Sequence, residues 1–252
     1  MLAATIVLPA IQQTEAATNV VVWDTGSPLA DAADIKSRAG WKPVPSELFI
    51  MEADPSKAAS DPGYYGREYA FQGDAVVENR SLAAVFWSAK GRVVIYSKAN
   101  PTQPGGASSG NSGLGRKILE FTPLQPKAQP ATISHCGILR NADDEVALEV
   151  FFSAKGATDV SAVFAFGKTE IVEIKPAANM KGVSLLSPIE YGIVPSFIGD
   201  DLIFNPAEYA SANILCVPAE NLFLGLLPGE DQMLVMTWPK GKQQMKLSLN
   251  QE

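Results

Sequence analysis

The chain has 252 residues, 46% of them hydrophobic and 19% charged, a composition typical of a globular protein and too apolar for a disordered one. Its net charge of −7, with no block of Lys and Arg, argues against a nucleic-acid-binding surface. No stretch reaches the roughly 20 apolar residues that a helix needs to span a bilayer.

The first segment in chain order is a short apolar run, residues 2–11 (LAATIVLPAI), followed by polar residues and then by Ala16 and Ala17. An apolar run before small residues is typical of a secretory signal. The positive charges that normally precede such a run are missing, so a truncated signal and an ordinary buried strand both fit. We expect a signal-type segment at residues 1–17 and export to the periplasm, the cell envelope or the extracellular space.

Three later segments share a hairpin pattern. Residues 82–97 and 146–166 each hold two apolar runs around the sequence Ser-Ala-Lys-Gly, and residues 233–249 hold a looser copy around Lys240 and Gly241. Glycine closes such turns because it adopts positive φ without strain. We expect each of the three segments to form a β-hairpin.

The remaining strands are predicted where apolar and polar residues alternate or where β-branched residues cluster, namely at residues 19–23, 48–51, 74–77, 117–122, 132–139, 145–152, 170–174 and 183–186. Convincing helical character is confined to residues 29–38. Strands at intervals of about 8–12 residues, without crossover helices, predict an all-β, antiparallel β-sandwich with very little helix. It would form one large or two consecutive sandwich-like units.

Two tracts rich in Gly, Ser or Pro interrupt the strands. Residues 100–115 (NPTQPGGASSGNSGLG) have few apolar anchors and are expected to form a poorly ordered loop, whereas residues 123–130 carry three prolines. The boundary is placed at the second tract, which gives an N-terminal β domain at 18–125 and a C-terminal β-sandwich domain at 126–252. A strand lies close to the last residue, as expected for the N-terminal part of a longer protein.

Three short motifs lack the context that their chemistry needs. Residues 106–110 match a G-x-S-x-G nucleophile motif, but no Asp lies between Ser108 and the single histidine, His135. Residues 110–117 have Arg and Lys where a phosphate-binding loop has Lys and Ser or Thr. Residues 79–81 (NRS) fit the glycosylation acceptor, a pattern that is frequent by chance.

The sequence provides little for metal or cofactor chemistry, and no cofactor or metal is expected. His135 alone cannot build a three-histidine site and is expected to be a hydrogen-bonded structural residue, while Asp200 and Asp201 supply too few oxygens for calcium. Cys136 and Cys216 are not spaced as a metal-binding pair. A disulfide in an exported protein and two small buried thiols both remain open.

Residues 61–69 (DPGYYGREY) form the loop that most resembles a binding site. Aromatic faces that stack on sugar rings, beside charged groups that bind hydroxyls, are what a glycan site on a rigid β-scaffold needs. Alternatively, the tyrosines cover a sheet edge. The candidate ligand-binding residues are Tyr64, Tyr65, Arg67, Glu68 and Tyr69.

We therefore expect a non-catalytic β-sandwich module of an exported protein, either glycan-binding or an interaction scaffold for further domains of the same polypeptide. The very apolar residues 221–239 are expected to be core strands, and they would be a docking face if exposed. No catalytic residue is identified. The competing hypothesis is a polysaccharide hydrolase or lyase, which predicts two carboxyl groups facing each other at roughly 5–9.5 Å across a cleft.

Overall fold

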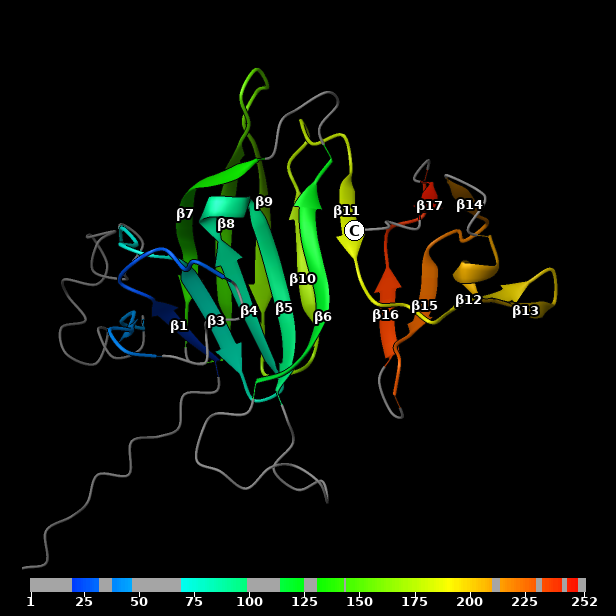
Figure 1. Cartoon of the computed structure of the whole chain (residues 1–252), viewed down its shortest axis with the longest axis horizontal. Coiled ribbons are helices and arrows are strands. Elements are labelled where there is room, and N and C mark those ends of the chain that lie inside the picture. The colour runs from blue at the N-terminus through cyan, green and yellow to red at the C-terminus, as the bar shows by residue number, and fades with distance from the viewer. Residues whose placement is uncertain are drawn as a thin grey trace, which may run out of the picture.

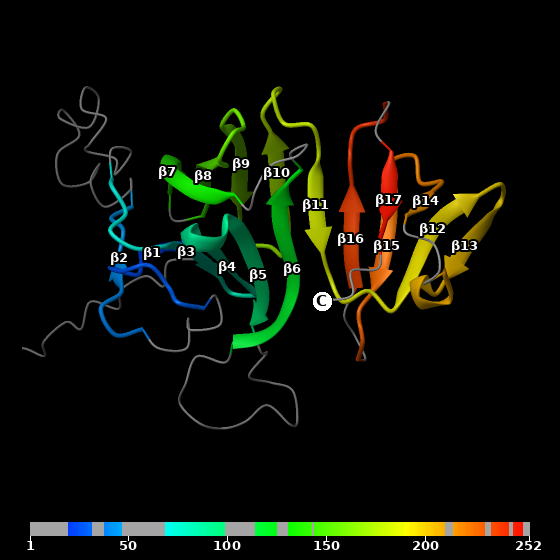
Figure 2. The same ribbon diagram turned by 45° about the horizontal axis from the view of Figure 1, so that its top comes forward.

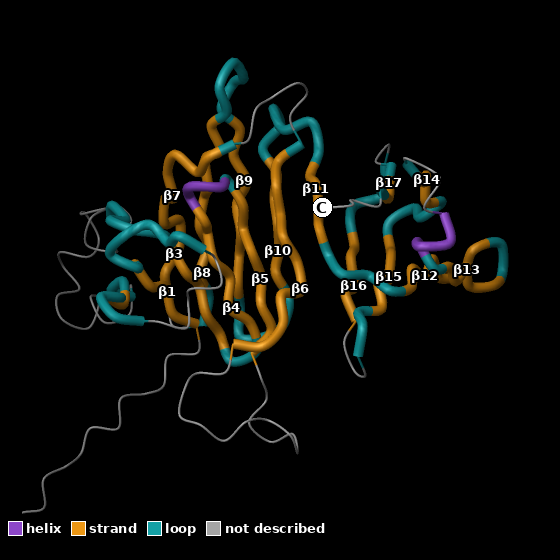
Figure 3. The backbone as a smooth tube through the Cα atoms, in the orientation of Figure 1, coloured by secondary structure: helices purple, strands orange, loops and turns teal. Residues whose placement is uncertain are grey.

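The computed structural model describes residues 20–31, 38–46, 69–98, 114–124, 131–142, 144–209, 214–229, 233–241 and 244–248. Their regular secondary structure is almost entirely antiparallel strand, so the prediction of an all-β sandwich with very little helix is confirmed (Figure 1). The helical turns among them are two short 3-10 segments, Ser88–Lys90 and Pro206–Tyr209 (Figure 3). No helix in these ranges is long and apolar enough to cross a membrane.

Two sheets make up the larger unit. Sheet A has the order β11-β6-β5-β4-β3-β1-β2 and consists of β1 (Val20–Asp24), β2 (Lys42–Pro43), β3 (Ala75–Asn79), β4 (Leu82–Trp87), β5 (Arg92–Lys98), β6 (Leu114–Pro123) and β11 (Val183–Leu186). Sheet B has the order β10-β9-β8-β7 and consists of β7 (Thr132–Asn141), β8 (Val146–Ser153), β9 (Val160–Phe166) and β10 (Val172–Pro176).

Sheets A and B lie face to face as two layers, which Figure 2 shows from a second direction. Every second residue of β8 and β9 is buried, as expected for strands with one face on a core. The aromatic centre of that core is Phe164 of β9, whose ring lies edge-on to Phe86 of β4 at 5.5 Å and to Phe121 of β6 at 5.0 Å between centroids. One hydrophobic core therefore holds the two sheets together.

This core crosses the boundary placed between residues 125 and 126. Its buried residues run from Val20 on β1 to Phe166 on β9, and β11 returns to pair with β6. The proline-rich residues 123–130 thus lie in the chain between the strands of two layers that share one core. By packing, the larger unit comprises β1 to β11.

A smaller unit follows. Sheet C has the order β13-β12-β15-β16, and sheet D pairs β14 with β17; their strands are β12 (Tyr191–Phe197), β13 (Asp200–Phe204), β14 (Leu215–Val217), β15 (Leu222–Leu226), β16 (Met233–Thr237) and β17 (Met245–Leu247). Phe223 is buried at the centre of its core. This unit contacts the larger one through Leu234, which packs against the first core, and through Ser187, whose hydroxyl donates to the Ile118 carbonyl at 2.7 Å.

The first two predicted hairpins are confirmed, and the third is wrong. β4 pairs with β5 and β8 with β9, with Gly91 and Gly156 at positive φ in the two connections. In the third segment, β16 pairs with β15 and β17 pairs with β14, so its two halves belong to different sheets. Alternation identified both strands but carried no information about their partners.

Several other sequence predictions fall on parts of the chain outside the described residues. These include the signal-type segment at 1–17, the strand at 48–51 and most of the loop at 100–115, whose last two residues begin β6. Of the helical prediction at 29–38, the described residues 29–31 and 38 are not helical.

Candidate functional site

Tyr69 is the one predicted site residue that the structure describes. Its hydroxyl donates a 2.9 Å hydrogen bond to Asp24 Oδ2, and its ring packs edge-on against Phe71 with centroids 5.2 Å apart. Tyr69 therefore attaches the C-terminal end of the tyrosine loop, residues 61–69, to the end of β1. Its four companions, Tyr64, Tyr65, Arg67 and Glu68, lie outside the described residues.

Asp24 is the buried acceptor at this anchor, and it is 2% exposed. Besides the Tyr69 hydroxyl it accepts the backbone N–H groups of Gly26 at 2.8 Å and of Gln72 and Gly73 at 2.9 Å. Burial alone would raise the pKa of Asp24, but these donors outweigh burial and lower it below the ordinary value. Burial, followed by the bond to Asp24, raises the pKa of Tyr69 to about 12.

Asp74, at the start of β3, is a second buried carboxylate and is 1% exposed. It accepts the backbone N–H groups of Leu29 at 2.8 Å and Ser88 at 2.9 Å, while the indole N–H of Trp87 donates to the Leu29 carbonyl at 3.0 Å. These bonds hold the segment after β1 across the outer face of sheet A. Asp24 and Asp74 therefore organise loops.

The outer face of sheet A carries an aromatic and cationic cluster, on the opposite side of β1 from the Tyr69–Asp24 anchor. β1 alternates, with Val20 and Val22 buried in the core and Trp23 on the opposite face. The guanidinium carbon of Arg38 lies 5.7 Å from the ring centroid of Trp23 and 5.4 Å from that of Trp41, within the range of cation–π attraction. We call these three residues the tryptophan–arginine cluster.

Two glutamates lie beneath cations on the same outer face. Glu78 of β3 pairs with Arg38 at 2.6 Å and with Lys98 at 3.8 Å. Glu120 of β6 pairs with Lys117 at 3.3 Å and with Arg92. Both carboxylate side chains are 7% exposed, whereas the four cations are 27–44% exposed. The charge that these two clusters present to solvent is therefore positive, whereas exposed Asp31 adds a negative charge near Tyr96 of the same face.

Sequence reasoning missed this surface for a simple reason. Its residues are drawn from β1, β3, β5, β6 and the segment before β2, and their proximity depends on sheet order. Strand alternation contains part of the signal. Glu78 lies two residues after Val76, and Glu120 pairs with Val94, so both glutamates lie on the face away from the core.

The outer face of sheet C is apolar and exposed. One cross-strand row runs Val235, Leu224, Ile193, Ile203, with Met233 and Tyr191 beside it. Ile203 is 61% exposed and Val235 is 52% exposed. The prediction that residues 221–239 form core strands thus holds for one face of β15, which buries Phe223, and fails for the opposite face.

The glycosylation-type sequence at residues 79–81 has a structural role. Asn79 is 5% exposed; its amide donates to the Gly167 and Thr169 carbonyls, both at 2.8 Å, and its carbonyl oxygen accepts the N–H groups of Ser81 and Leu82. The glycosylation match is thus a turn that also ties sheet A to sheet B.

His135 is exposed on β7 beside Phe151, with the two ring centroids 5.8 Å apart, and is thus less enclosed than expected of a structural histidine. Asp200 and Asp201 lie at the start of β13. Within the described ranges no group of three or more His, Cys, Asp or Glu side chains could hold a metal ion.

The cysteines are free thiols. Cys136 packs partly buried against the first core, and burial, with the charge of Asp74, raises its pKa to about 12. Cys216 is exposed, so the alternative of two buried thiols is wrong for this residue. Its strand, β14, is the edge of a two-stranded sheet, and edge strands expose their outward side chains.

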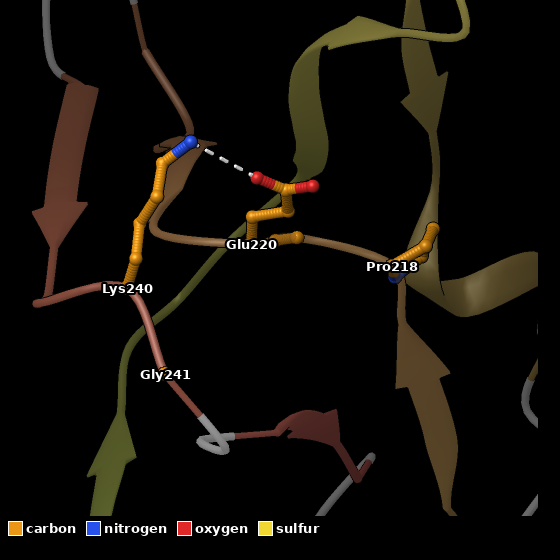
Figure 4. A pocket seen from close by; sticks show the side chains of 5 residues that line it. Pro218, Glu220, Lys240 and Gly241 are labelled. Carbon is orange, nitrogen blue, oxygen red and sulfur yellow. Dashed lines mark hydrogen bonds and ion pairs between the residues drawn. The ribbon is translucent and has the colours of Figure 1, made fainter.

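One open hollow on the smaller unit is lined by Pro218, Glu220, Lys240 and Gly241 (Figure 4). Lys240 Nζ lies 3.2 Å from Glu220 Oε2, and both side chains are more than 70% exposed. A solvated ion pair of this kind contributes little to stability and leaves the hollow open to water.

Comparison with known proteins found no matching family model, no similar curated protein and no similar solved structure.

Proposed function

We propose that the chain is a non-catalytic module of an exported protein and that its larger unit binds glycan where the tyrosine loop meets sheet A. The observation that carries the proposal is the tryptophan–arginine cluster on the outer face of sheet A; the Tyr69–Asp24 anchor lies at the end of the same strand, β1, but on its core side. Indole faces and a guanidinium group offer both the stacking surface and the hydroxyl-binding donors that sugars require.

The covalent chain limits how far the predicted aromatic residues can lie from Tyr69. On the loop's N-terminal side, the Val44 N–H donates to the Val22 carbonyl at 2.9 Å, and on its C-terminal side Tyr69 bonds Asp24. The described residues on either side of positions 47–68 are therefore attached to β1. Five residues of chain limit the Cα of Tyr64 to about 18 Å from that of Tyr69.

The described carboxylates favour binding over hydrolysis. Glu78 and Glu120 share one face of sheet A but are separated by three strand spacings, or about 14 Å, which exceeds the roughly 5–9.5 Å of a glycosidase pair. Asp24 and Asp74 are buried and bonded to N–H donors. Neither arrangement provides a carboxylic acid poised to protonate a leaving group.

The test is affinity electrophoresis of the whole chain against a panel of soluble polysaccharides. Each aromatic contact contributes on the order of 1–2 kcal/mol, so Tyr64→Ala with Tyr65→Ala, and Trp41→Ala alone, should weaken retention about tenfold or more. The matched control is Tyr209→Ala, an exposed tyrosine of the smaller unit. Equal weakening by the control, or no retention of the wild type by any polysaccharide, contradicts the proposal.

A second candidate, an interaction scaffold, is favoured by the exposed apolar face of sheet C. Its central row, Val235, Leu224, Ile193 and Ile203, carries no charge, so two copies of the face can approach without bringing like charges together in that row. Two sheets stack about 10 Å apart through such faces. Sedimentation should show concentration-dependent self-association that Val235→Asp abolishes. A monomer at every concentration refutes this candidate.

A further inference from the structure

We infer that the ligand of the larger unit is an anionic polysaccharide bearing carboxylate groups, held across the outer face of sheet A by the cations above Glu78 and Glu120. The inference rests on the proposed function and narrows it to one chemical class of glycan. It adds Arg92, Lys98 and Lys117 to the binding surface.

The first support is the layered arrangement of charge. Each glutamate is almost fully covered and pairs with two cations, so one positive charge in each cluster remains uncompensated by its own carboxylate. The four cations are 27–44% exposed although their glutamates are buried. A ligand carboxylate can therefore reach Arg92 or Lys117 while the cation stays paired with Glu120.

The second support is the local balance of charge against that of the whole chain. Residues 75–123, which include β3 to β6, carry six Lys and Arg side chains against Glu78 and Glu120 alone. The whole chain has a net charge of −7. A locally positive stretch in an otherwise acidic chain favours the approach of anions at this face, and the charge of Asp31 near Tyr96 acts against it.

The third support is the spacing of the clusters. They stand on β3 and β6, about 14 Å apart, and the residues in the row between them, Ala83 and Tyr96, are buried. A polymer with a carboxylate on each sugar, lying across the strands, would meet both clusters, and the Glu78 cluster includes Arg38 with its two tryptophans. One small anion would engage a single cluster, so the arrangement favours a polymer.

The experiment compares polygalacturonate, a polymer of carboxylated sugars, with a neutral galactan by affinity electrophoresis of the whole chain. Wild-type retention by polygalacturonate should fall steeply as salt rises, because charge–charge contacts are screened. Arg92→Gln with Lys117→Gln should weaken it about fivefold or more. The matched control, Lys155→Gln with Lys168→Gln, changes net charge equally at exposed turns of sheet B and should have no effect.

A further variant separates binding from folding. Arg92 and Lys117 cover the buried carboxylate of Glu120, which would be left unpaired if both cations were removed. The triple variant, in which Glu120→Gln is added to Arg92→Gln and Lys117→Gln, removes that carboxylate charge as well. It should melt close to the wild type and still fail to bind polygalacturonate. Wild-type retention of that variant overturns the inference.

The outcomes distinguish this inference from the function on which it rests. Retention by neutral galactan but not by polygalacturonate overturns the anionic ligand and leaves glycan binding standing. Retention by no polysaccharide overturns both. Equal retention by duplex DNA overturns the assignment to glycans, because the face would then bind any polyanion.

Discussion

Removing the ring of Phe164 should destabilise strands on both sides of residue 125. Phe164 is fully buried on β9, and its edge-on partners are Phe86 and Phe121 in the other sheet. Phe164→Ala deletes the only ring of sheet B that contacts both of these residues among the described aromatic pairs. The cavity that it leaves therefore lies between the two layers.

The expected cost is about 3–5 kcal/mol, the range found when a buried phenylalanine is replaced by alanine. With a urea dependence of about 2 kcal/mol per molar, the unfolding midpoint should fall by about 1.5–2.5 M. Phe164→Leu keeps most of the volume and should cost less than about 1.5 kcal/mol, so it remains measurable if the alanine variant does not fold.

Tryptophan fluorescence provides the assay. Trp23, Trp41 and Trp87 all pack on the outer face of sheet A, and the fourth, Trp238, belongs to the smaller unit. In a Trp238→Phe background the signal therefore reports sheet A alone. Phe223→Ala, in the core of the smaller unit, is the matched control and should shift this transition less than Phe164→Ala does.

The result that would refute a single shared core is a sheet A transition that neither Phe164 variant moves. The boundary at 125/126 would then separate two independently stable domains, and residues 18–125 should fold when expressed alone. A shared core instead predicts that this fragment fails to fold, because its inner face would lose the covering sheet.

Three further predictions follow from single contacts. Gly91→Ala should destabilise the protein by several kcal/mol, because the new Cβ would collide with the backbone carbonyl just before β7. Gly156→Ala has open space around its Cβ and should cost only the roughly 1–2 kcal/mol of a positive φ. Thermal melts of the two variants test this difference. Asn79→Ala should cost about 2–4 kcal/mol by stranding buried backbone groups, with Ser81→Ala as a near-neutral control in the same denaturation assay. The folded pKa of Asp24 is lowered, so its contribution to stability is full above about pH 4, the unfolded value, and is lost as pH falls through the folded value. Asp24→Asn should remove that acid-dependent part from unfolding free energies measured between pH 7 and pH 2.

Most strands were predictable because their signal is local. Alternation in β8 and β9, and the glycine after Ser-Ala-Lys, depend on neighbouring residues alone. The identical tetrapeptides nevertheless form different connections: a 3-10 turn at Ser88–Lys90 joins β4 to β5, and a longer loop joins β8 to β9. Surrounding contacts decide which connection forms, since Gly91 lies against the chain entering β7 and Gly156 does not.

The site was less predictable because its contacts are distant in sequence. Tyr69 was identified as an aromatic loop residue, but its partner Asp24 is 45 positions away. Arg38 reaches Glu78 across 40 positions. Neither pairing leaves a periodic trace, because each depends on how β1 is inserted beside β3 in sheet A.

The order of strands in the larger unit has a consequence for the nascent chain. β3 to β6 and β7 to β10 are two meanders in which each strand pairs with the next, so each sheet assembles through short-range contacts that form quickly. The central strands of sheet A, β3 to β6, are nonetheless all synthesised before any strand of sheet B. At roughly 5–20 residues per second, the stretch from Pro123 to Phe166 takes about 2–9 s to translate. Throughout that interval the apolar inner face of the first meander is open to other chains, which makes it a natural point of engagement for a chaperone.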